Sequence, residues 1–207
     1  MAAALWYAYT MTERHFITDL HDGHEFVSRL RGFETVEEHR AALDENIRKA
    51  VRKDDTLYIL GDLAMNPHKA GTFAWIQSLP GTKHFISGNH DLVHPAHSKS
   101  LKEQQRPEWR DTFATVNPFA RIKVLGKTVL LSHFPYEGEG GRENITERWA
   151  EYRLRDEGHF LIHGHTHDTM IEHYSAKGTP LFHAGVDAHG LKPVSEHEIT
   201  SWVERHL

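Results

Sequence analysis

The segment Phe85 to Asp91, of sequence FISGNHD, carries three chemically different groups on consecutive residues. The Asn89 amide can offer a carbonyl oxygen to a metal ion, and the His90 imidazole can bind a metal or move a proton near neutral pH. The Asp91 carboxylate can orient that imidazole or bind a cation. An ordinary turn can contain the same tetrapeptide, so this segment alone does not decide between a structural and a chemical role.

Similar groups follow two other apolar runs that read as strands. Asp19 and His21 follow the run 15–18, and Asp62 follows Gly61 after the run 56–60. Alternate residues at a strand end project to the same side, so Asp19 and His21 are expected to converge. Ligands of α/β folds bind at the carboxyl edge of the sheet, where Asp62 would lie. The other interpretation of Asp62 is a helix N-cap.

The densest group of imidazoles in the chain follows the apolar strand 160–162. It contains His163, His165 and His167 on alternate positions. On an extended segment these rings would face one way, and a turn at Gly164 would re-aim them. Such a cluster favours metal binding. His133 ends the second strand of a hairpin predicted over 119–125 and 128–132.

These strand ends supply more donors than one metal ion can use. Because the chain has no cysteine, any metal must rest on nitrogen and oxygen ligands, which suit manganese, iron or zinc. Two ions about 3.5–4 Å apart, bridged by one carboxylate, would use the donors and would suit hydrolysis of a phosphate ester. The strand-end candidates are Asp19, His21, Asp62, Asn89, His90, His133, His165 and His167.

Helices between these strands are expected to hold the candidate residues in place. Capping-box spacing predicts helix starts at Thr35, for a helix ending near Lys53, and at Ser195. Further helices are predicted after Gly23 through Arg31, over 73–79 and over 146–156. We expect a single domain over 1–207, with a candidate N-terminal extension over 1–14 and candidate lid loops over 94–118 and 136–146.

Composition excludes several classes of partner. The 207 residues carry a formal net charge of −5 with interspersed signs, so we expect no stable complex with nucleic acid. The apolar stretch 1–11 is too short to span a bilayer, and no other run approaches that length. We therefore expect a cytoplasmic protein with no membrane partner. The triplet at 126–128 is not a P-loop, because Arg121 stands where its first glycine belongs.

Taken in order, these motifs resemble the calcineurin-like metallophosphoesterases, in particular their small bacterial and phage-encoded members. The family pattern D-x-H, G-D, G-N-H-[D/E], H and G-H-x-H matches Asp19 to His21, Gly61-Asp62, Gly88 to Asp91, His133 and Gly164 to His167. The match covers about residues 15 to 168. The resemblance implies an α/β fold of four α/β/β/α layers, with two mixed sheets flanked by helices.

The resemblance also implies a role for each matched residue. Asp19, His21 and His167 would hold one divalent ion. Asn89, His133 and His165 would hold the other, and Asp62 would bridge them. Manganese is favoured, with iron, zinc or nickel as alternatives. A metal-bridged hydroxide would attack the phosphorus, and His90 would be the general acid, kept charged by Asp91 or another acid.

Two further histidines adjoin the matched motifs. His24 is expected to contact substrate phosphate or to support a ligand, and His163 is expected to be structural.

Other functions fit the motifs less well. A metallo-β-lactamase-like nuclease would need a histidine after Asp168, and a helical HD phosphohydrolase would not place His90-Asp91 after a strand. A non-catalytic scaffold would have lost metal ligands. We favour a phosphodiesterase acting on small diesters or nucleotides, including cyclic ones, because a poor alkoxide leaving group needs an acid such as His90. A phosphomonoesterase, a protein phosphatase or a nuclease on the same fold stays open, as does the oligomeric state.

Overall fold

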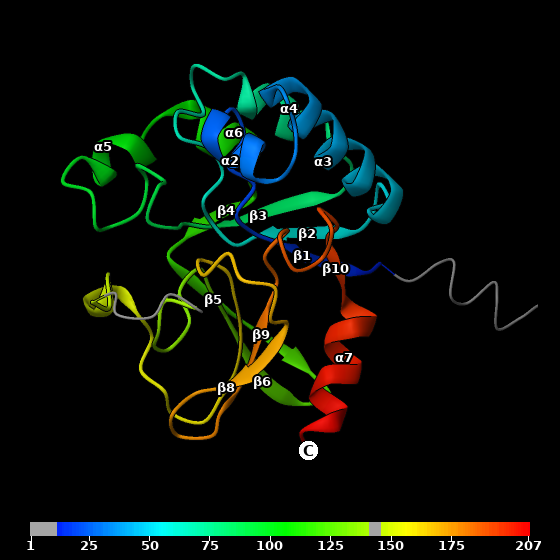
Figure 1. Cartoon of the computed structure of the whole chain (residues 1–207), viewed down its shortest axis with the longest axis vertical. Helices are drawn as coiled ribbons and strands as arrows, with labels where there is room; N and C mark the ends of the chain where they lie inside the picture. The colour runs from blue at the N-terminus through cyan, green and yellow to red at the C-terminus, as the bar shows by residue number, and fades with distance from the viewer. Residues whose placement is uncertain (1–11, 141–145) are drawn as a thin grey trace, which may run out of the picture.

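The computed structural model describes residues 12–140 and 146–207, and its strands form two five-stranded sheets (Figure 1). The first sheet has the order β10-β1-β2-β3-β4. Its strands β1 to β4 are parallel, and β10 pairs antiparallel with β1. The bounds are β1 (Arg14–Ile17), β2 (Thr56–Ile59), β3 (Thr82–Ile86), β4 (Thr115–Asn117) and β10 (Val194–Ser195).

The second sheet has the order β5-β6-β7-β9-β8. Its three central strands are parallel, and the edge strands β5 and β8 are antiparallel to their neighbours. The predicted β5–β6 hairpin is confirmed, with Val124 paired to Lys127 across the turn. The bounds are β5 (Phe119–Val124), β6 (Lys127–Ser132), β7 (Phe160–His163), β8 (Glu172–Tyr174) and β9 (Pro180–His183).

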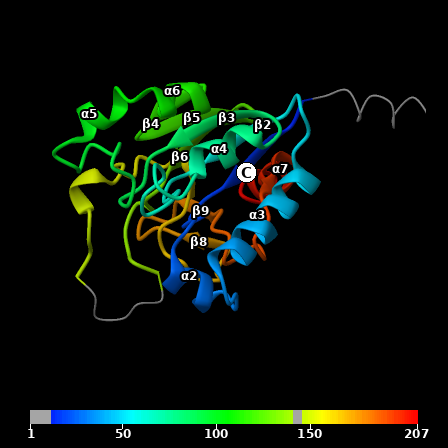
Figure 2. The ribbon, with the colours of Figure 1, turned by 90° about the horizontal axis from the view of Figure 1, so that it is seen from above.

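Six α-helices and one 3-10 turn connect these strands within the described residues. Both predicted capping boxes are present: Thr35 and Glu38 close the start of α3, and Ser195 and Glu198 close the start of α7. Figure 2 shows α3 crossing the molecule beside the sheets. The bounds are α2 (Glu25–Leu30), α3 (Val36–Ala50), α4 (Thr72–Ser78), α5 (Ser100–Gln104), α6 (Pro107–Thr112), η1 (Ala150–Tyr152) and α7 (Glu196–Arg205).

Two apolar cores hold the layers together. One lies between the first sheet and helices α3, α4 and α6, and Trp109 is fully buried in it. The other lies between the two sheets, where Trp202 of α7 packs against Phe160 and Phe182. The opposite face of the second sheet is covered by Tyr136 and its neighbours. The predicted α/β fold with two mixed sheets and flanking helices is confirmed.

Two predicted segments differ from the structure. The range 94–118 is not a loop throughout, because it forms α5, α6 and β4, and buried Trp109 makes α6 part of the core. The helix predicted over 146–156 is reduced to η1. In that segment Arg148 and Arg153 both bind the Glu139 carboxylate, which holds the chain in an irregular path. Most of the predicted extension 1–14, and residues 141–145 of the second lid, lie outside the described residues.

The two sheets bring their parallel strands to one edge. An isolated parallel bridge between Thr18 and Gly185 joins the end of β1 to the end of β9, so the carboxyl ends of both sheets meet there. In α/β folds this edge is where ligands bind. Within 12–140 and 146–207, every helix is too short or too polar to cross a lipid bilayer.

Candidate metal centre

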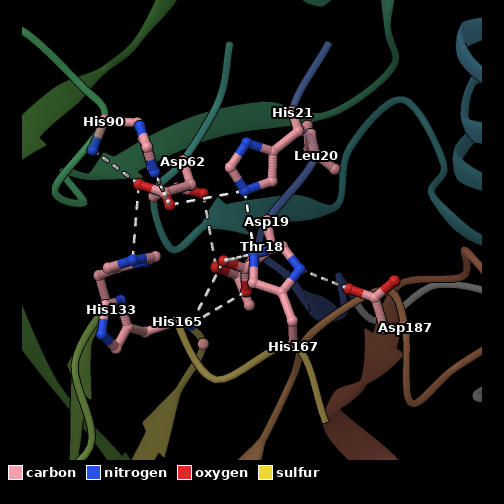
Figure 3. A network of polar contacts seen from close by, with 12 residues as sticks. Thr18, Asp19, Leu20, His21, Asp62, His90, His133, His165, His167 and Asp187 are labelled. Atoms are coloured by element: carbon pink, nitrogen blue, oxygen red, sulfur yellow. Dashed lines mark hydrogen bonds and ion pairs between the residues drawn. The ribbon is translucent and has the colours of Figure 1, made fainter. Parts of the chain in front are cut away.

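A first set of donor atoms converges at the ends of β1, β2 and β7. Nε2 of His21 lies 3.0 Å from Nε2 of His167, and Nε2 of His167 lies 3.5 Å from a carboxylate oxygen of Asp19. Nε2 of His21 also lies 3.5 Å from Oδ2 of Asp62. One ligand atom from each of the four residues lies within 4.8 Å of the others. Figure 3 shows these side chains pointing toward one another.

A second set converges beside the first, at the ends of β3, β6 and β7. Oδ1 of Asn89 lies 3.2 Å from Nε2 of His133 and 2.8 Å from Nδ1 of His165. Nε2 of His133 also lies 3.5 Å from Oδ1 of Asp62. Asp62 therefore turns one carboxylate oxygen toward each set, which is the orientation that a bridging ligand needs.

Hydrogen bonds fix the ring orientation of three of these histidines. Nδ1 of His133 lies 2.8 Å from the Leu60 carbonyl oxygen. Nδ1 of His167 lies 2.9 Å from the Asp187 carboxylate, and Nε2 of His165 lies 3.2 Å from the Glu139 carboxylate. An acceptor at one ring nitrogen keeps the proton there and leaves the lone pair of the other nitrogen for a metal.

The protonation state of three of the four rings also suits metal binding. Burial lowers the pKa of His21 and His133, and burial together with the nearby His133 lowers the pKa of His165 to about 3. These rings are therefore neutral at pH 7, as a ligand must be. Burial alone would lower the pKa of His167, but the Asp19 and Asp187 carboxylates raise it.

The two buried carboxylates of the first set repel each other. Burial and the negative charge of Asp19 raise the pKa of Asp62 to about 8. The pKa of Asp19 is held low: burial opposes its ionisation, but His167, His133 and His21 favour it. Two oxygen donors of like charge this close together gain from a cation between them. The nitrogen, amide and carboxylate donors therefore fit divalent transition-metal ions at both sets.

The backbone carries the ligands in an unusual conformation. Asp19 and His21 are predicted to lie on one face of a strand end, but β1 ends at Ile17 and both residues lie beyond it with positive φ. The convergence was predicted correctly and its cause was not. Five of the seven predicted metal ligands have φ between 46° and 74°: Asp19, His21, Asp62, His165 and His167.

Three motif glycines allow the ligand loops to approach closely. A Cβ on Gly88 would lie 2.5 Å from Oδ1 of Asp62, and a Cβ on Gly164 would lie 2.5 Å from Oδ2 of Asp19. A Cβ on Gly61 would lie 2.6 Å from Nδ1 of His133. Any side chain at these positions would displace a ligand, which is the physical reason for glycine in each motif.

His90 lies at the edge of the centre rather than within it. Its side chain is 43% exposed, and its nearest acid is Asp62, whose Oδ2 is 3.9 Å from Nε2 of His90. Burial and the neighbouring His133 and His24 lower the pKa of His90. It is therefore open to a substrate and is not needed to complete either donor set.

Asp91 does not have the expected role beside His90. Its carboxylate accepts hydrogen bonds from the backbone N–H groups of Gly88 (2.7 Å), Asp62 (2.9 Å) and Leu63 (3.0 Å). Burial and the charge of Asp62 raise its pKa to about 7. Asp91 thus joins the loops after β2 and β3, and the amides that occupy its oxygens are the reason why it does not orient His90.

The two other predicted histidines lie in different surroundings. His24 precedes α2 and lines a pocket beside the centre, with its ring centroid 5.7 Å from that of His21. Its contact with substrate stays a prediction. His163 is buried in β7, where its Nδ1 lies 2.8 Å from the Gly164 carbonyl oxygen. It is not part of either donor set, in keeping with a structural role.

Three residues that support the ligands were not predicted from the sequence. Asp187 follows β9, so the strand-end rule that found Asp62 would also have found it. Arg31 holds Asp187 through two hydrogen bonds of 2.7 Å and is itself nearly buried. Glu139 lies in a glycine-rich stretch, where nothing in the local sequence points to contact with His165.

Comparison with known proteins agrees with this geometry. The sequence profile described as the calcineurin-like phosphoesterase superfamily domain matches residues 15–187. The gene 66 protein of Mycobacterium phage L5 is 41% identical over 201 residues, which are 91% of this chain and 93% of that protein. The gene 66 protein of Mycobacterium phage D29 is 35% identical over 206 residues, which are 95% of this chain and 100% of that protein.

A solved structure has the same fold. It is that of a protein of unknown function from Aquifex aeolicus, which is 27% identical and superposes with a TM-score of 0.64. The match covers 93% of this chain and 100% of that chain. The overall fold is therefore shared with that protein.

Proposed function

The chain belongs to the calcineurin-like phosphoesterase superfamily, and we propose that it is a dinuclear metal-dependent phosphodiesterase of small substrates. The observation that carries this proposal is the orientation of Asp62, which turns one oxygen toward His21 and the other toward His133. Two donor sets that share one carboxylate are suited to two ions about 4 Å apart.

Each residue then has a defined task. Asp19, His21 and His167 would hold one ion, and Asn89, His133 and His165 the other, with Asp62 between them. Bound divalent ions, for which we favour manganese, would lower the pKa of water and offset the charge of the phosphate. His90, half exposed at the rim, has a lowered pKa in the metal-free protein, so it would take up a proton beside the negatively charged phosphate and donate it to the leaving oxygen.

The charge of the surrounding pocket supports a diester over a monoester. Arg31 is the only lysine or arginine among the described residues that line it. Its guanidinium already donates to Asp187 and to the carbonyl oxygens of Asp19 and Leu20. A monoester dianion would gain from a further cation there, whereas a diester carries a single negative charge.

The test compares hydrolysis of bis-p-nitrophenyl phosphate and p-nitrophenyl phosphate after chelation and after manganese is added back. We expect manganese-dependent turnover with the diester preferred. His90→Ala is expected to lower kcat for the diester by about 10²–10⁴-fold while manganese binding, measured by calorimetry, is retained. His159→Ala is the matched control, since this exposed histidine precedes β7 at the opposite end from His165.

Three outcomes would count against the proposal. Turnover that survives chelation would exclude a metal-dependent reaction. A preference for the monoester would replace the diesterase by a phosphatase. Unchanged turnover in His90→Ala would remove His90 from the reaction.

A further inference from the structure

A pocket of about 650 Å³ opens beside the candidate metal centre. Its lining includes the imidazoles of His21 and His167 and that of His90 at the rim. It also includes a group of apolar side chains, which we call the apolar end, next to the Arg31–Asp187 ion pair. A pocket of this size suits a ligand considerably larger than a phosphate group. The apolar end is lined by Phe26, Val27, Leu30, Val186 and Leu191.

The apolar end includes large side chains that the fold leaves uncovered. Phe26 is 66% exposed and Leu30 is 70% exposed. They are four residues apart on α2 and so lie on the same face of that helix. Other aromatic rings of the chain, such as Phe73, Phe85 and Trp109, are buried in the cores. An exposed ring that borders a reaction centre is therefore available to contact a ligand.

His24 lies between the centre and the Phe26 ring, and its contacts give the distance between them. The ring centroid of His24 lies 5.7 Å from that of His21 and 6.5 Å from that of Phe26. Phe26 is therefore separated from the metal ligands by the width of one further ring. A ligand with its phosphate at the centre would reach Phe26 only if a spacer about the size of a sugar joined the phosphate to an apolar or aromatic group.

The charges at the apolar end favour a ligand whose group at that end is neutral. Arg31 is committed to Asp187 and to backbone carbonyl oxygens, so it offers no additional charge to a second phosphate. A polyphosphate or a nucleic-acid strand would place further phosphates where the wall is hydrocarbon. A planar base satisfies both conditions, because it is uncharged and stacks on aromatic rings.

We propose that Phe26, Leu30 and Leu191 form a subsite for the base of a nucleotide ester whose phosphate lies at the metal centre. This inference rests on the proposed function, because it needs a phosphate ester at Asp62. It adds a determinant of specificity: the enzyme distinguishes nucleotides from other small diesters by stacking of the base on Phe26.

The test measures competitive inhibition of bis-p-nitrophenyl phosphate hydrolysis by the manganese-loaded protein. The inhibitors are adenosine 5′-monophosphate and ribose 5-phosphate, which share the ribose and the phosphate and carry adenine and a hydroxyl group, respectively, at C1 of the sugar. We expect adenosine 5′-monophosphate to bind about 10-fold more tightly, equivalent to about 1.4 kcal/mol. Phe26→Ala is expected to reduce this ratio to about 2, and Phe26→Trp to preserve it.

Phe119→Ala is the matched control, because Phe119 is a 53% exposed ring on β5 that does not line the pocket. It should leave the ratio unchanged. Equal inhibition by the two compounds in the wild type, or an equal ratio in wild type and Phe26→Ala, would overturn the subsite. So would a dimer that Phe26→Ala dissociates in sedimentation experiments, since a second copy would then cover the ring.

Failure of the proposed function and failure of the subsite would give different experimental results. If bis-p-nitrophenyl phosphate is not hydrolysed, that function fails. Calorimetric titration of the manganese-loaded protein with the same two compounds then measures the affinity ratio directly. A ratio near 10 that depends on Phe26 would support the subsite, and a ratio near 1 would overturn it.

Discussion

Replacing Asp187 by asparagine tests whether a carboxylate outside the donor sets controls one metal position. Oδ2 of Asp187 contacts both Nδ1 of His167 (2.9 Å) and Nη2 of Arg31 (2.7 Å), and Oδ1 contacts Nε of Arg31 (2.7 Å). An asparagine has only one acceptor oxygen. With its NH₂ group at the Oδ2 position, Asp187→Asn faces N–H groups of both His167 and Arg31. With the NH₂ group at the Oδ1 position it faces Nε–H of Arg31 and leaves His167 a neutral carbonyl oxygen in place of a carboxylate.

The magnitude follows from the contacts with these two partners. Loss of the carboxylate partner of a metal-binding histidine typically weakens metal binding 10–100-fold, or about 1.4 to 2.7 kcal/mol. The free energy of unfolding should also fall by about 1.5 to 3 kcal/mol, because a hydrogen bond to nearly buried Arg31 is lost. Arg31 keeps its bonds to the carbonyl oxygens of Asp19 and Leu20, so the fold should survive.

The assay is a calorimetric titration of the chelated protein with manganese, accompanied by urea unfolding of the metal-free protein. We expect one of two binding events to weaken by the stated factor and the other to stay within about twofold. Asp168→Asn is the matched control, because its carboxylate accepts from the Met170 amide and contacts neither His167 nor Arg31. It should leave both binding events unchanged.

The reasoning would be refuted if folded Asp187→Asn bound manganese as tightly as the wild type at both positions. It would also be refuted if Asp168→Asn produced the same loss, because the effect would then be one of general charge rather than of contact with His167. A single binding event in the wild type would contradict the dinuclear proposal itself.

Three further predictions concern other parts of the chain. Glu139→Gln should weaken the other manganese-binding event about 10-fold in the same titration, because Glu139 holds His165. Gly88→Ala should abolish tight binding at both positions and lower the free energy of unfolding by about 1 to 3 kcal/mol, because its Cβ would meet Asp62. Asp55→Asn should lower the free energy of unfolding at pH 7 by about 2 kcal/mol, measured with urea. That difference should begin to shrink as the pH falls below about 4, the unfolded-state pKa, and should go on shrinking as the pH falls through the lower folded-state pKa.

The sign of the last effect follows from the pKa of Asp55. Burial opposes ionisation of Asp55, but hydrogen bonds from the Arg52 side chain and from the amides of Glu13 and Arg52 hold its pKa below the ordinary value. A lowered folded-state pKa gives stability that is present above the unfolded-state pKa and lost as the pH falls through the folded-state pKa. A difference that grew in acid would contradict this assignment.

The control for Gly88→Ala is a glycine away from the ligands. Gly178→Ala has no atom within 4 Å of the new Cβ but has φ of 79°, so it should lower stability and leave manganese binding intact. Loss of manganese binding there would mean that general destabilisation explains Gly88→Ala. If Glu139→Gln weakened the same event as Asp187→Asn, the two donor sets would not be separate.

Much of the fold and most of the candidate site could be predicted because their signals are local. A strand, a glycine and then an acid or amide occur within a few residues at Asp62 and Asn89, and each capping box is complete within four residues. These patterns follow from backbone geometry, so they do not depend on distant parts of the chain.

The remainder depends on contacts between distant residues. The carboxylates that hold His167 and His165 come from 20 and 26 residues away, which no local pattern encodes. Segment 146–156 has helical composition, but its arginines bind Glu139 instead. Helix α6 is predicted as part of a lid loop because Trp109 is its one large apolar side chain and gives no helical periodicity; in the structure Trp109 packs in the core and Thr112 is also buried.

The positive φ values at the ligands explain why the surrounding loops are so closely bonded. Each such residue costs about 1–3 kcal/mol and persists only where its neighbours fix it. The amides of Asp19 and His21 donate to the carbonyl oxygens of Gly61 and Asp62, and Asp91 binds the loops after β2 and β3 together. The ligand loops therefore fix one another through protein contacts, and metal binding does not have to supply the free energy of ordering them.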